Sequence, residues 1–358
     1  MRIGIIGAGQ LGQMLGYAAR KLGHECYFLD PSDAPPAAKA GPVIQAAFDD
    51  RVALSILAEK CDVLTYEFEN VPVEALQDIT DKVPVYPPHD ALRLAQDRLT
   101  EKQLFKQLDI PLPQYQQIDS ADDLGQAVES VGLPLVIKTR RMGYDGKGQF
   151  VLQKEEQVSA AWQELGGKAL IAEQWVNFDY EVSAIGVRSA NGEIATYCLT
   201  HNEHAAGILR VSRAPVEDDV LTAKANRYMH SMLEHLDYVG VLALELFVVG
   251  NKLLANEFAP RVHNSGHWTI EGAETSQFSN HILAVTNATP GSTATLGHAG
   301  MINLIGRIPD AARELGNGTL HDYGKSARPG RKLGHITVVA DSADGRDTLI
   351  DHISRSVT

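Results

Sequence analysis

Two neighbouring apolar segments, LALELF at 242–247 and KLLANEF at 252–258, each carry one glutamate near the centre. Read as adjacent β-strands, they place Glu245 and Glu257 on faces that should be at least half-buried, because side chains alternate between the two faces of a strand. A buried carboxylate is costly unless it is paired, hydrogen-bonded or metal-bound. Two carboxylates on adjacent strands also repel, which raises one pKa unless a cation lies between them. The pattern therefore predicts a site for a hard cation such as Mg²⁺, with water and phosphate completing its coordination shell.

The residues that follow these segments favour this interpretation. The alternative is a pair of glutamates that face solvent at the edge of a sheet. A run as polar as Asn256, Arg261, His263, Asn264, Ser265 and His267, directly after a buried strand, is more typical of residues that line a cleft.

The composition limits the classes of protein that the chain can represent. Its 358 residues are enough for two or three domains. A formal net charge of −13 argues against a general binder of nucleic acid or of anionic membranes. Cys26, Cys61 and Cys198 lie far apart, so neither disulfides nor zinc are expected. With no leader-like segment and no apolar run of membrane length, we expect a cytoplasmic protein.

The order of the patterns predicts an α/β protein with three domains. RIGIIG, HECYFLD and CDVLTYE read as strands separated by helical spacing, which is typical of a parallel sheet covered by helices. The prolines of DIPLPQYQQ predict a linker near residue 110. A small glycine-rich unit follows, and longer strands begin at Glu181. We place the domains at 1–109, 110–180 and 181–358.

GAGQLG at 7–12 lies between a predicted strand and a predicted helix. Its glycines permit a tight turn, and the N–H groups at a helix N-terminus attract an anion. Asp30 follows at about the spacing of a ribose-binding acid in a dinucleotide site, so an NAD-dependent dehydrogenase is an alternative. Such loops also bind single phosphate groups, or serve only as turns.

Lys138 ends the predicted strand PLVIK, and the glycine-rich RRMGYDGKGQ follows it. Lys138, Lys147 and the glycines at 143, 146 and 148 suit a triphosphate under a lid that excludes water. A hairpin with surface lysines explains the same residues. Glu173 closes the strand ALIAEQW, where the backbone of 174–176 could meet an adenine edge, although an ordinary strand end fits too.

The basic residues of the tail, Lys325, Arg328, Arg331 and Lys332, have two interpretations. A run of charge is most often a solvated face. Pro329 and Gly330 form a turn, however, and that turn could direct Arg331 and Lys332 at one phosphate.

Together these segments resemble the ATP-grasp superfamily over essentially the whole chain. The resemblance is carried by GAGQLGQML, DRLTEKQLF, GYDGKGQ, THNEHAAGILR, ELF, NEFAPRVHNSGHWT, SQF, MINLIG and RPGRKLGH. It is strongest to the branch that carboxylates aminoimidazole ribonucleotide in purine biosynthesis. It implies an N-terminal preATP-grasp domain with a Rossmann-like parallel sheet, a small lid domain and a C-terminal α+β domain, with ATP between the last two.

The resemblance also implies site residues and ligands. The nucleotide contacts would be Arg98, Lys138, Gly143, Tyr144, Asp145, Gly146, Lys147, Gly148, Gln149, Glu173, Gln174, Trp175, Val176, Glu181, His204, Asn256 and Glu257. The ribonucleotide contacts would be Gly9, Gln10, Leu11, Tyr144, Asp145, His263, Asn264, Ser265, Lys325, Arg331 and Lys332. Glu245 and Glu257 would hold Mg²⁺, Lys138 would stabilise the transferred phosphoryl group, and Arg261 would bind bicarbonate or carboxyphosphate.

The implied reaction is an ATP-driven carboxylation by a homodimer. Bicarbonate attacks the γ-phosphate of ATP, and carboxyphosphate, or CO₂ released from it, reacts with the exocyclic amine. Other ATP-grasp ligases, such as a formate-dependent glycinamide ribonucleotide transformylase or a D-alanine ligase, are alternatives that RPGRKLGH and HNSGHW argue against. A dehydrogenase leaves the lid glycines and the glutamate pair without a role. A non-catalytic nucleotide-binding module is a third alternative.

Overall fold

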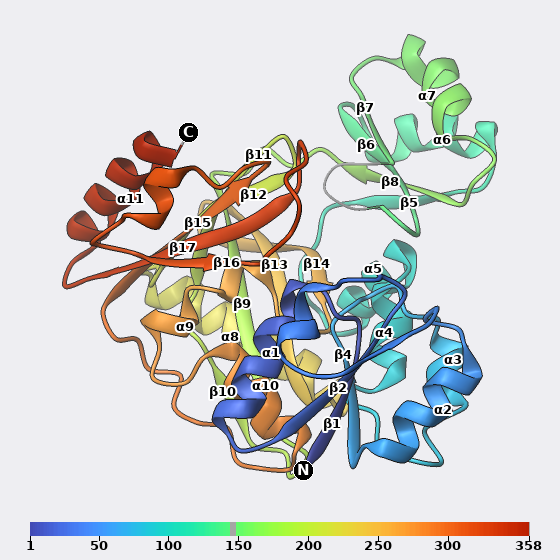
Figure 1. Cartoon of the computed structure of the whole chain (residues 1–358). Helices are drawn as coiled ribbons and strands as arrows, with labels where there is room; N and C mark the ends of the chain where they lie inside the picture. Colours follow the sequence, from blue (N-terminus) through green and yellow to red (C-terminus); the bar gives the residue numbers. More distant parts are fainter. Residues whose placement is uncertain (144–147, 358) are drawn as a thin grey trace.

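The computed structural model describes residues 1–143 and 148–357, which form three β-sheets with helices packed around them (Figure 1). The strands are β1 Arg2–Ile6, β2 Glu25–Asp30, β3 Val43–Gln45, β4 Val63–Tyr66, β5 Tyr115–Ile118, β6 Leu135–Thr139, β7 Gln149–Leu152, β8 Leu170–Gln174, β9 Tyr180–Arg188, β10 Ile194–Thr196, β11 Thr200–Ala205, β12 Ile208–Ala214, β13 Gly240–Val249, β14 Lys252–Ala259, β15 His298–Ile305, β16 Thr319–Asp322 and β17 Lys332–Ala340. The α-helices are α1 Gln10–Lys21, α2 Arg51–Lys60, α3 Val73–Gln77, α4 His89–Ala95, α5 Arg98–Gln107, α6 Ala121–Val131, α7 Val158–Leu165, α8 Asp219–His235, α9 Thr269–Gly272, α10 Gln277–Val285 and α11 Ala343–Val357.

The first sheet has the order β3-β2-β1-β4, and every pairing in it is parallel. This confirms the parallel sheet that the alternating patterns predict. Beside β4, a single parallel bridge joins Leu64 to Val85. Helix α1 begins directly after the glycine turn, and Gly7 has a φ of 101°, a conformation that favours glycine.

The second sheet, β5-β8-β6-β7, is antiparallel and packs against α6 and α7. It has its own apolar core, which includes Ile118, Ile137 and Leu170, and it projects from the rest of the molecule (Figure 1). The linker prediction is wrong for the second half of DIPLPQYQQ, because Tyr115–Ile118 is strand β5. The sequence YQQI of this short strand contains two adjacent glutamines, so it lacks the alternation of apolar and polar residues that would predict a strand. Its extended conformation depends on pairing with β8.

The third sheet has nine strands, in the order β14-β13-β9-β11-β12-β15-β17-β16 with β10 paired to β9. Helices α8 and α10 cover opposite faces of β13, because Leu242 and Leu244 pack with α8 while Val241 and Ala243 pack with α10. The chain ends in α11, which packs on β15 and β17 and was not expected from the sequence. Among the helices in the described part of the chain, none is long and apolar enough to cross a bilayer.

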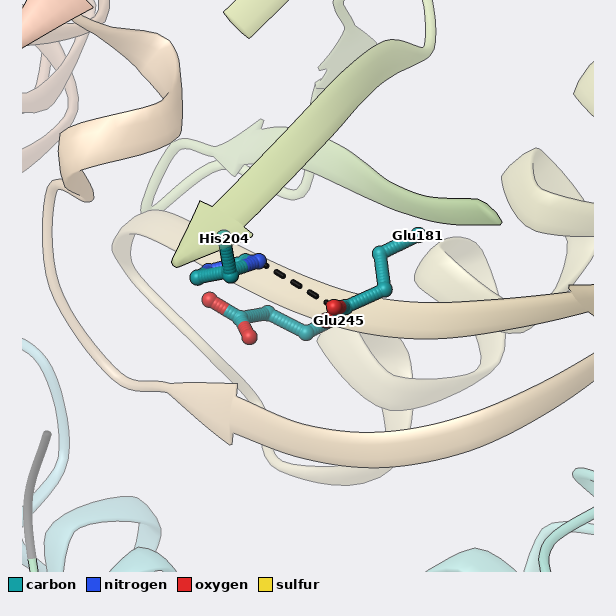
Figure 2. Close-up of side chains that lie close together, drawn as sticks. All are labelled: Glu181, His204 and Glu245. Atoms are coloured by element: carbon teal, nitrogen blue, oxygen red, sulfur yellow. Dashed lines mark ion pairs between the residues drawn. The ribbon is translucent and has the colours of Figure 1, made fainter. Parts of the chain in front are cut away.

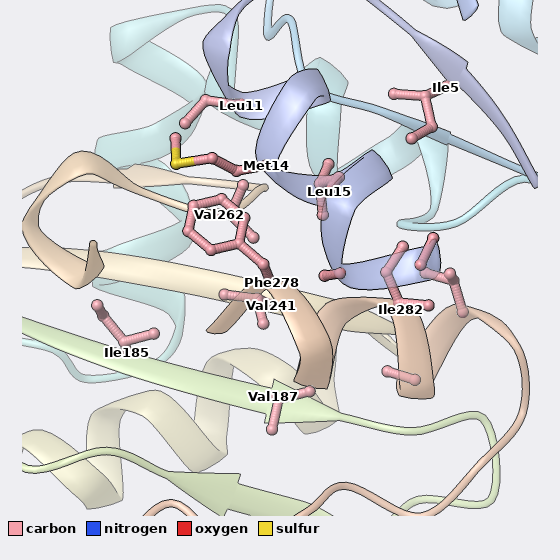
Figure 3. Close-up of a cluster of buried hydrophobic side chains, with 14 of the residues drawn as sticks. Ile5, Leu11, Met14, Leu15, Ile185, Val187, Val241, Val262, Phe278 and Ile282 are labelled. Carbon is pink, nitrogen blue, oxygen red and sulfur yellow. The ribbon is translucent and has the colours of Figure 1, made fainter. Parts of the chain in front are cut away.

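The first and third sheets share one apolar core. Leu11, Met14 and Leu15 of α1 pack toward Phe278 and Ile282 of α10 (Figure 3). Because α10 lies between α1 and the third sheet, the glycine turn at the start of α1 is held in a defined position relative to β13 and β14.

A buried histidine on α10 joins the same two units. His281 Nε2 lies 2.8 Å from Thr65 Oγ1 of β4, and its Nδ1 accepts the N–H of Val241 at 3.1 Å. Burial lowers the pKa of His281 to about 3. The ring is therefore neutral at pH 7, with Nδ1 as acceptor and Nε2–H as donor.

We expect His281 to make the free energy of unfolding fall in acid. Its folded pKa of about 3 lies below the unfolded value of 6.5, so the unfolded chain binds more protons between these limits, and stability is lost as pH falls through the window. Between pH 7 and pH 4, the free energy of unfolding should fall by on the order of 3 kcal/mol less in His281→Gln than in the wild type. Urea unfolding at both pH values measures it. An acid dependence equal to that of the wild type would contradict the assignment.

Candidate active site

Glu245 of β13 and Glu257 of β14 are direct cross-strand partners, and a β-bulge follows Glu245. The side chain of Glu245 is 13% exposed, whereas that of Glu257 is 42% exposed. Bulges are common beside active sites, where they redirect side chains. The structure thus places the two carboxylates side by side, as the sequence predicts.

The environment of this pair separates its two pKa values. Burial, and then the charge of Glu257, raises the pKa of Glu245 to about 8. Burial also raises the pKa of Glu257, but Arg98 and then Lys138 outweigh that effect and hold it below its ordinary value. Arg98 Nη1 lies 2.9 Å from Glu257 Oε2. Two adjacent carboxylates whose mutual repulsion raises one pKa are a suitable site for a divalent cation, which would relieve that repulsion.

Two lysines meet on Glu173 at the junction between the second sheet and α5. Lys138 Nζ of β6 lies 3.1 Å from Glu173 Oε2, and Lys102 Nζ lies 3.4 Å from the same oxygen. Burial raises the pKa of Glu173, but Lys102 and then Lys138 outweigh it and lower the pKa to about 2. Lys102 also donates to the carbonyl oxygen of Asn256. Lys138 and Glu173 therefore lie close to Asn256 of β14, through Lys102.

Lys102 was missed in the sequence. It is fully buried, and the helix that carries it also presents Arg98 and Glu101 to β14. Burial raises the pKa of Glu101 to about 8, and its Oε1 accepts the N–H of Phe258 at 2.7 Å. Arg98, Glu101 and Lys102 lie within about one helical turn of DRLTEKQLF, and this grouping of charges could have indicated that all three belong to the site.

Glu181, His204 and Glu245 converge from β9, β11 and β13 (Figure 2). Their potential ligand atoms all lie within 4.8 Å of one another. His204 Nδ1 lies 3.2 Å from Glu181 Oε1, and although burial lowers the pKa of His204, this hydrogen bond outweighs it and raises the pKa. Mg²⁺ prefers oxygen ligands, so the Glu181–His204 ion pair fits a polar ligand group better than it fits the metal.

His263 connects Glu245 to the polar run after β14. Its Nε2 lies 3.1 Å from Glu245 Oε1, and its Nδ1 lies 2.9 Å from Ser265 Oγ. Burial, and then Arg261, holds the pKa of His263 well below its ordinary value. Asn264 pairs with Asn303 of β15 through two amide hydrogen bonds. The structure thus brings His263 of this run to Glu245 and joins Asn264 to β15.

Arg261, which was expected to bind bicarbonate, is held by a residue that the sequence reasoning missed. Its Nη2 lies 2.6 Å from Glu69 Oε2. Glu67, two residues earlier, accepts the N–H of Gly9 at 2.7 Å, and burial raises its pKa. The signal was present in CDVLTYEFEN, because polar residues directly after a buried strand were also the reason for selecting the run after β14.

The glycine turn of GAGQLG is closed by carboxylates. Asp30 Oδ2 accepts the N–H of Ala8 at 2.8 Å, and Asp30 Oδ1 accepts the N–H of Ser32 at 2.9 Å. Both oxygens of Asp30 are therefore engaged by the backbone, which leaves it poorly suited to a ribose. Leu11 points into the core, so only its backbone could contact a ligand (Figure 3).

The tail reaches the glycine turn through Lys325, whose Nζ donates to Gln10 Oε1. Burial, and then Arg331, lowers the pKa of Lys325 to about 8. Lys332 contributes to the same depression. The structure therefore gathers the predicted basic residues of the tail near the predicted phosphate-binding turn.

The predicted lid residues are described only in part. Tyr144, Asp145, Gly146 and Lys147 lie outside the described residues. Gln149 begins β7 and pairs with Lys138 of β6. Trp175 and Val176 directly follow β8, and the Trp175 side chain is exposed.

Three family models match the chain in order. They are the ribonucleotide synthetase preATP-grasp domain over residues 1–96, the ATP-grasp domain over 103–278 and the phosphoribosylaminoimidazole carboxylase C-terminal domain over 299–347. The fold and the site thus define an ATP-grasp enzyme, an ATP-dependent ligase.

Individual relatives are more specific. The N5-carboxyaminoimidazole ribonucleotide synthase of Pseudomonas aeruginosa is 48% identical over 340 residues, which cover 94% of each chain. The crystal structure of N5-carboxyaminoimidazole ribonucleotide synthetase from Thermus thermophilus has a TM-score of 0.95 and 48% identity, with 99% of this chain and 98% of that chain covered. The Aspergillus clavatus enzyme, in complex with ADP and 5-aminoimidazole ribonucleotide, has a TM-score of 0.92 and 29% identity, with 99% of this chain and 98% of that chain covered. The chain belongs to the N5-carboxyaminoimidazole ribonucleotide synthase family, and this decides against the dehydrogenase alternative.

Proposed function

We propose that this ATP-dependent ligase carboxylates the exocyclic amine of 5-aminoimidazole ribonucleotide with bicarbonate, through carboxyphosphate, in purine biosynthesis. The products are N5-carboxyaminoimidazole ribonucleotide, ADP and phosphate. One observation carries the proposal. The Glu245–Glu257 pair contacts Arg98 on the nucleotide side and His263 on the side of the polar run, so one pair of carboxylates joins both halves of the reaction.

Glu245 and Glu257 would hold Mg²⁺, because they are adjacent carboxylates that can offer oxygen ligands. Their separated pKa values show that the two groups repel each other, and a cation would relieve this repulsion. When bound, the ion would neutralise phosphate charge. Lys138 stabilises charge on the γ-phosphate as bicarbonate attacks it and ADP leaves. The amine then attacks the carboxyl carbon, releases phosphate and loses a proton. Arg261, which Glu69 holds in place, binds the bicarbonate or carboxyphosphate oxygens.

The remaining site residues are divided between the two substrates that would lie on either side of the carboxylate pair. We assign to ATP the residues Arg98, Gly143, Gly148, Gln149, Glu173, Gln174, Trp175, Val176, Glu181, His204 and Asn256, together with residues 144–147. We assign to the ribonucleotide the residues Gly9, Gln10, Leu11, His263, Asn264, Ser265, Lys325, Arg331 and Lys332, together with residues 144 and 145. We retain the domain limits 1–109, 110–180 and 181–358, a homodimer and a cytoplasmic location as parts of the proposal.

A coupled assay of ADP release tests the function. Release of ADP with formation of the carboxylated ribonucleotide should require ATP, bicarbonate and 5-aminoimidazole ribonucleotide together, and should stop when EDTA removes Mg²⁺. Product formation from formate and glycinamide ribonucleotide, with none from bicarbonate, would overturn the proposal in favour of another ATP-grasp ligase.

We expect the protein to bind 5-aminoimidazole ribonucleotide and neither NAD⁺ nor NADP⁺. Asp30 is only 7% exposed, and both of its oxygens already accept backbone N–H groups, so it is poorly placed to accept ribose hydroxyls. Calorimetric titration with each ligand measures the difference. Micromolar binding of a dinucleotide, without binding of the ribonucleotide, would contradict the assignment of the glycine turn.

A further inference from the structure

The polar run after β14 is fastened by two buried side-chain amides that the proposed reaction does not use. The run carries His263 and Asn264, which we assign to the ribonucleotide. One amide, Gln277, is the first residue of α10, and the other, Asn303, lies on β15. They are 0% and 6% exposed. A buried amide needs partners for its oxygen and its two N–H groups, so the arrangement of these partners is informative.

Gln277 pairs with both backbone groups of His263. Its Oε1 accepts the N–H of His263 at 3.0 Å, and its Nε2 donates to the carbonyl oxygen of His263 at 2.7 Å. The same Nε2 lies 3.2 Å from Nδ1 of His267. A Cβ on Gly266 would lie only 2.7 Å from Gln277 Oε1, so glycine at 266 permits this close approach. Because both backbone groups are bound, the direction of the His263 side chain is set by α10.

Asn303 sets the orientation of the Asn264 amide. Its Nδ2 donates to the carbonyl oxygen of Leu209, which can only accept, at 3.0 Å. Asn303 Oδ1 therefore faces Asn264 Nδ2 at 3.1 Å, and Asn303 Nδ2 donates to Asn264 Oδ1 at 2.8 Å. This leaves the second N–H of Asn264, and one lone pair of its oxygen, with a defined direction.

The position of the His263 ring depends on the hydrogen bonds that Gln277 makes to the His263 backbone. Its Nε2 reaches Glu245 and its Nδ1 reaches Ser265, so a rotation of the backbone at 263 would break both contacts. An error of about 1 Å in a reacting group can cost on the order of 10²-fold in rate. The amides lie behind the run and need not touch a ligand to affect turnover.

We propose that Gln277 and Asn303 are positioning residues for the carboxylation step, and that Gln277 does most by fixing the backbone of His263. This inference rests on the proposed function, because it assumes that His263 and Asn264 contact the ribonucleotide or its carboxyl donor. It extends the site to α10 and β15, from which Gln277 and Asn303 hold this run in place.

Gln277→Glu tests the inference, because it keeps the acceptor for the His263 N–H and replaces the donor to the His263 carbonyl. We expect kcat to fall on the order of 10- to 100-fold and the ribonucleotide KM to rise, with ADP affinity changed by less than about twofold. Asn303→Asp should act in the same direction. Gln277→Met, which has a similar volume, replaces the glutamate variant if that variant does not fold.

Asn280→Asp is the matched control. Asn280 lies on the same helix, is fully buried, and pairs with both backbone groups of Gly291, in a loop without assigned site residues. It should lower the melting temperature while keeping kcat within about threefold of the wild type. Equal losses of kcat in Gln277→Glu and Asn280→Asp, or a parallel loss of ADP affinity, would reduce Gln277 to a structural role. A wild-type enzyme that does not carboxylate the ribonucleotide would refute the proposed function instead.

Discussion

Glu257→Gln and Glu245→Gln should each lower the rate of carboxylation by about 10²-fold or more, the scale for loss of a preorganised electrostatic contact. The two side chains are direct cross-strand neighbours, and glutamine keeps their shape but cannot provide the negative charge that each glutamate would offer to a metal ion. Glu257→Gln also leaves Arg98, which lies 2.9 Å from the carboxylate, without its charge partner. Steady-state kinetics at saturating ATP, with Mg²⁺ varied, measures both effects.

The fold should survive both substitutions. At Glu245 the pKa is raised to about 8, so a neutral side chain is already tolerated, and the Glu257 side chain is 42% exposed, so water can reach the end of the glutamine that replaces it. Glu234→Gln, on the exposed surface of α8, is the matched control and should change nothing. Near-normal turnover of both variants at saturating Mg²⁺ would contradict the assignment of the carboxylate pair to the metal.

Arg331→Ala and Lys332→Ala should each raise the ribonucleotide KM by tenfold to a hundredfold, with kcat and the ATP KM little changed. A charged hydrogen bond to phosphate contributes roughly 1.5–3 kcal/mol, and loss of uniform binding appears in KM. Arg331 Nη1 donates to Ser326 Oγ at 2.9 Å, which holds the turn that also carries Lys325. Initial rates with each substrate varied in turn provide both constants.

Arg313→Ala is the control for the tail, because Arg313 is an exposed arginine that pairs with Asp322 at 2.8 Å. It should leave both KM values unchanged, since a solvated ion pair contributes little. If the ATP KM rose in the Arg331 and Lys332 variants while the ribonucleotide KM stayed constant, the tail would serve the nucleotide, and the substrate assignment would lose its most specific support.

The sequence by itself determined the features that depend on residues close together along the chain. The segments at 242–247 and 252–258 are separated by a short turn, so they could only pair as a hairpin, and the cross-strand meeting of Glu245 and Glu257 followed from alternation. The glycine turn before α1 and the parallel first sheet could also be predicted from the sequence. Glycines mark the turn, and the alternation of strand and helix patterns along the chain indicates the parallel sheet. The family resemblance then supplied the reaction.

Only the tertiary structure decided which distant residues support that site. Arg261 pairs with Glu69, 192 residues away, and Lys102 reaches Asn256 across 154 residues. Gln277 and Asn303 hold the polar run from a different helix and a different strand. Strand β5 and helix α11 also depend on the sheets that they contact. Such contacts arise when whole elements pack together, and neither hydrophobic periodicity nor turn preference along a single segment carries information about its distant partner.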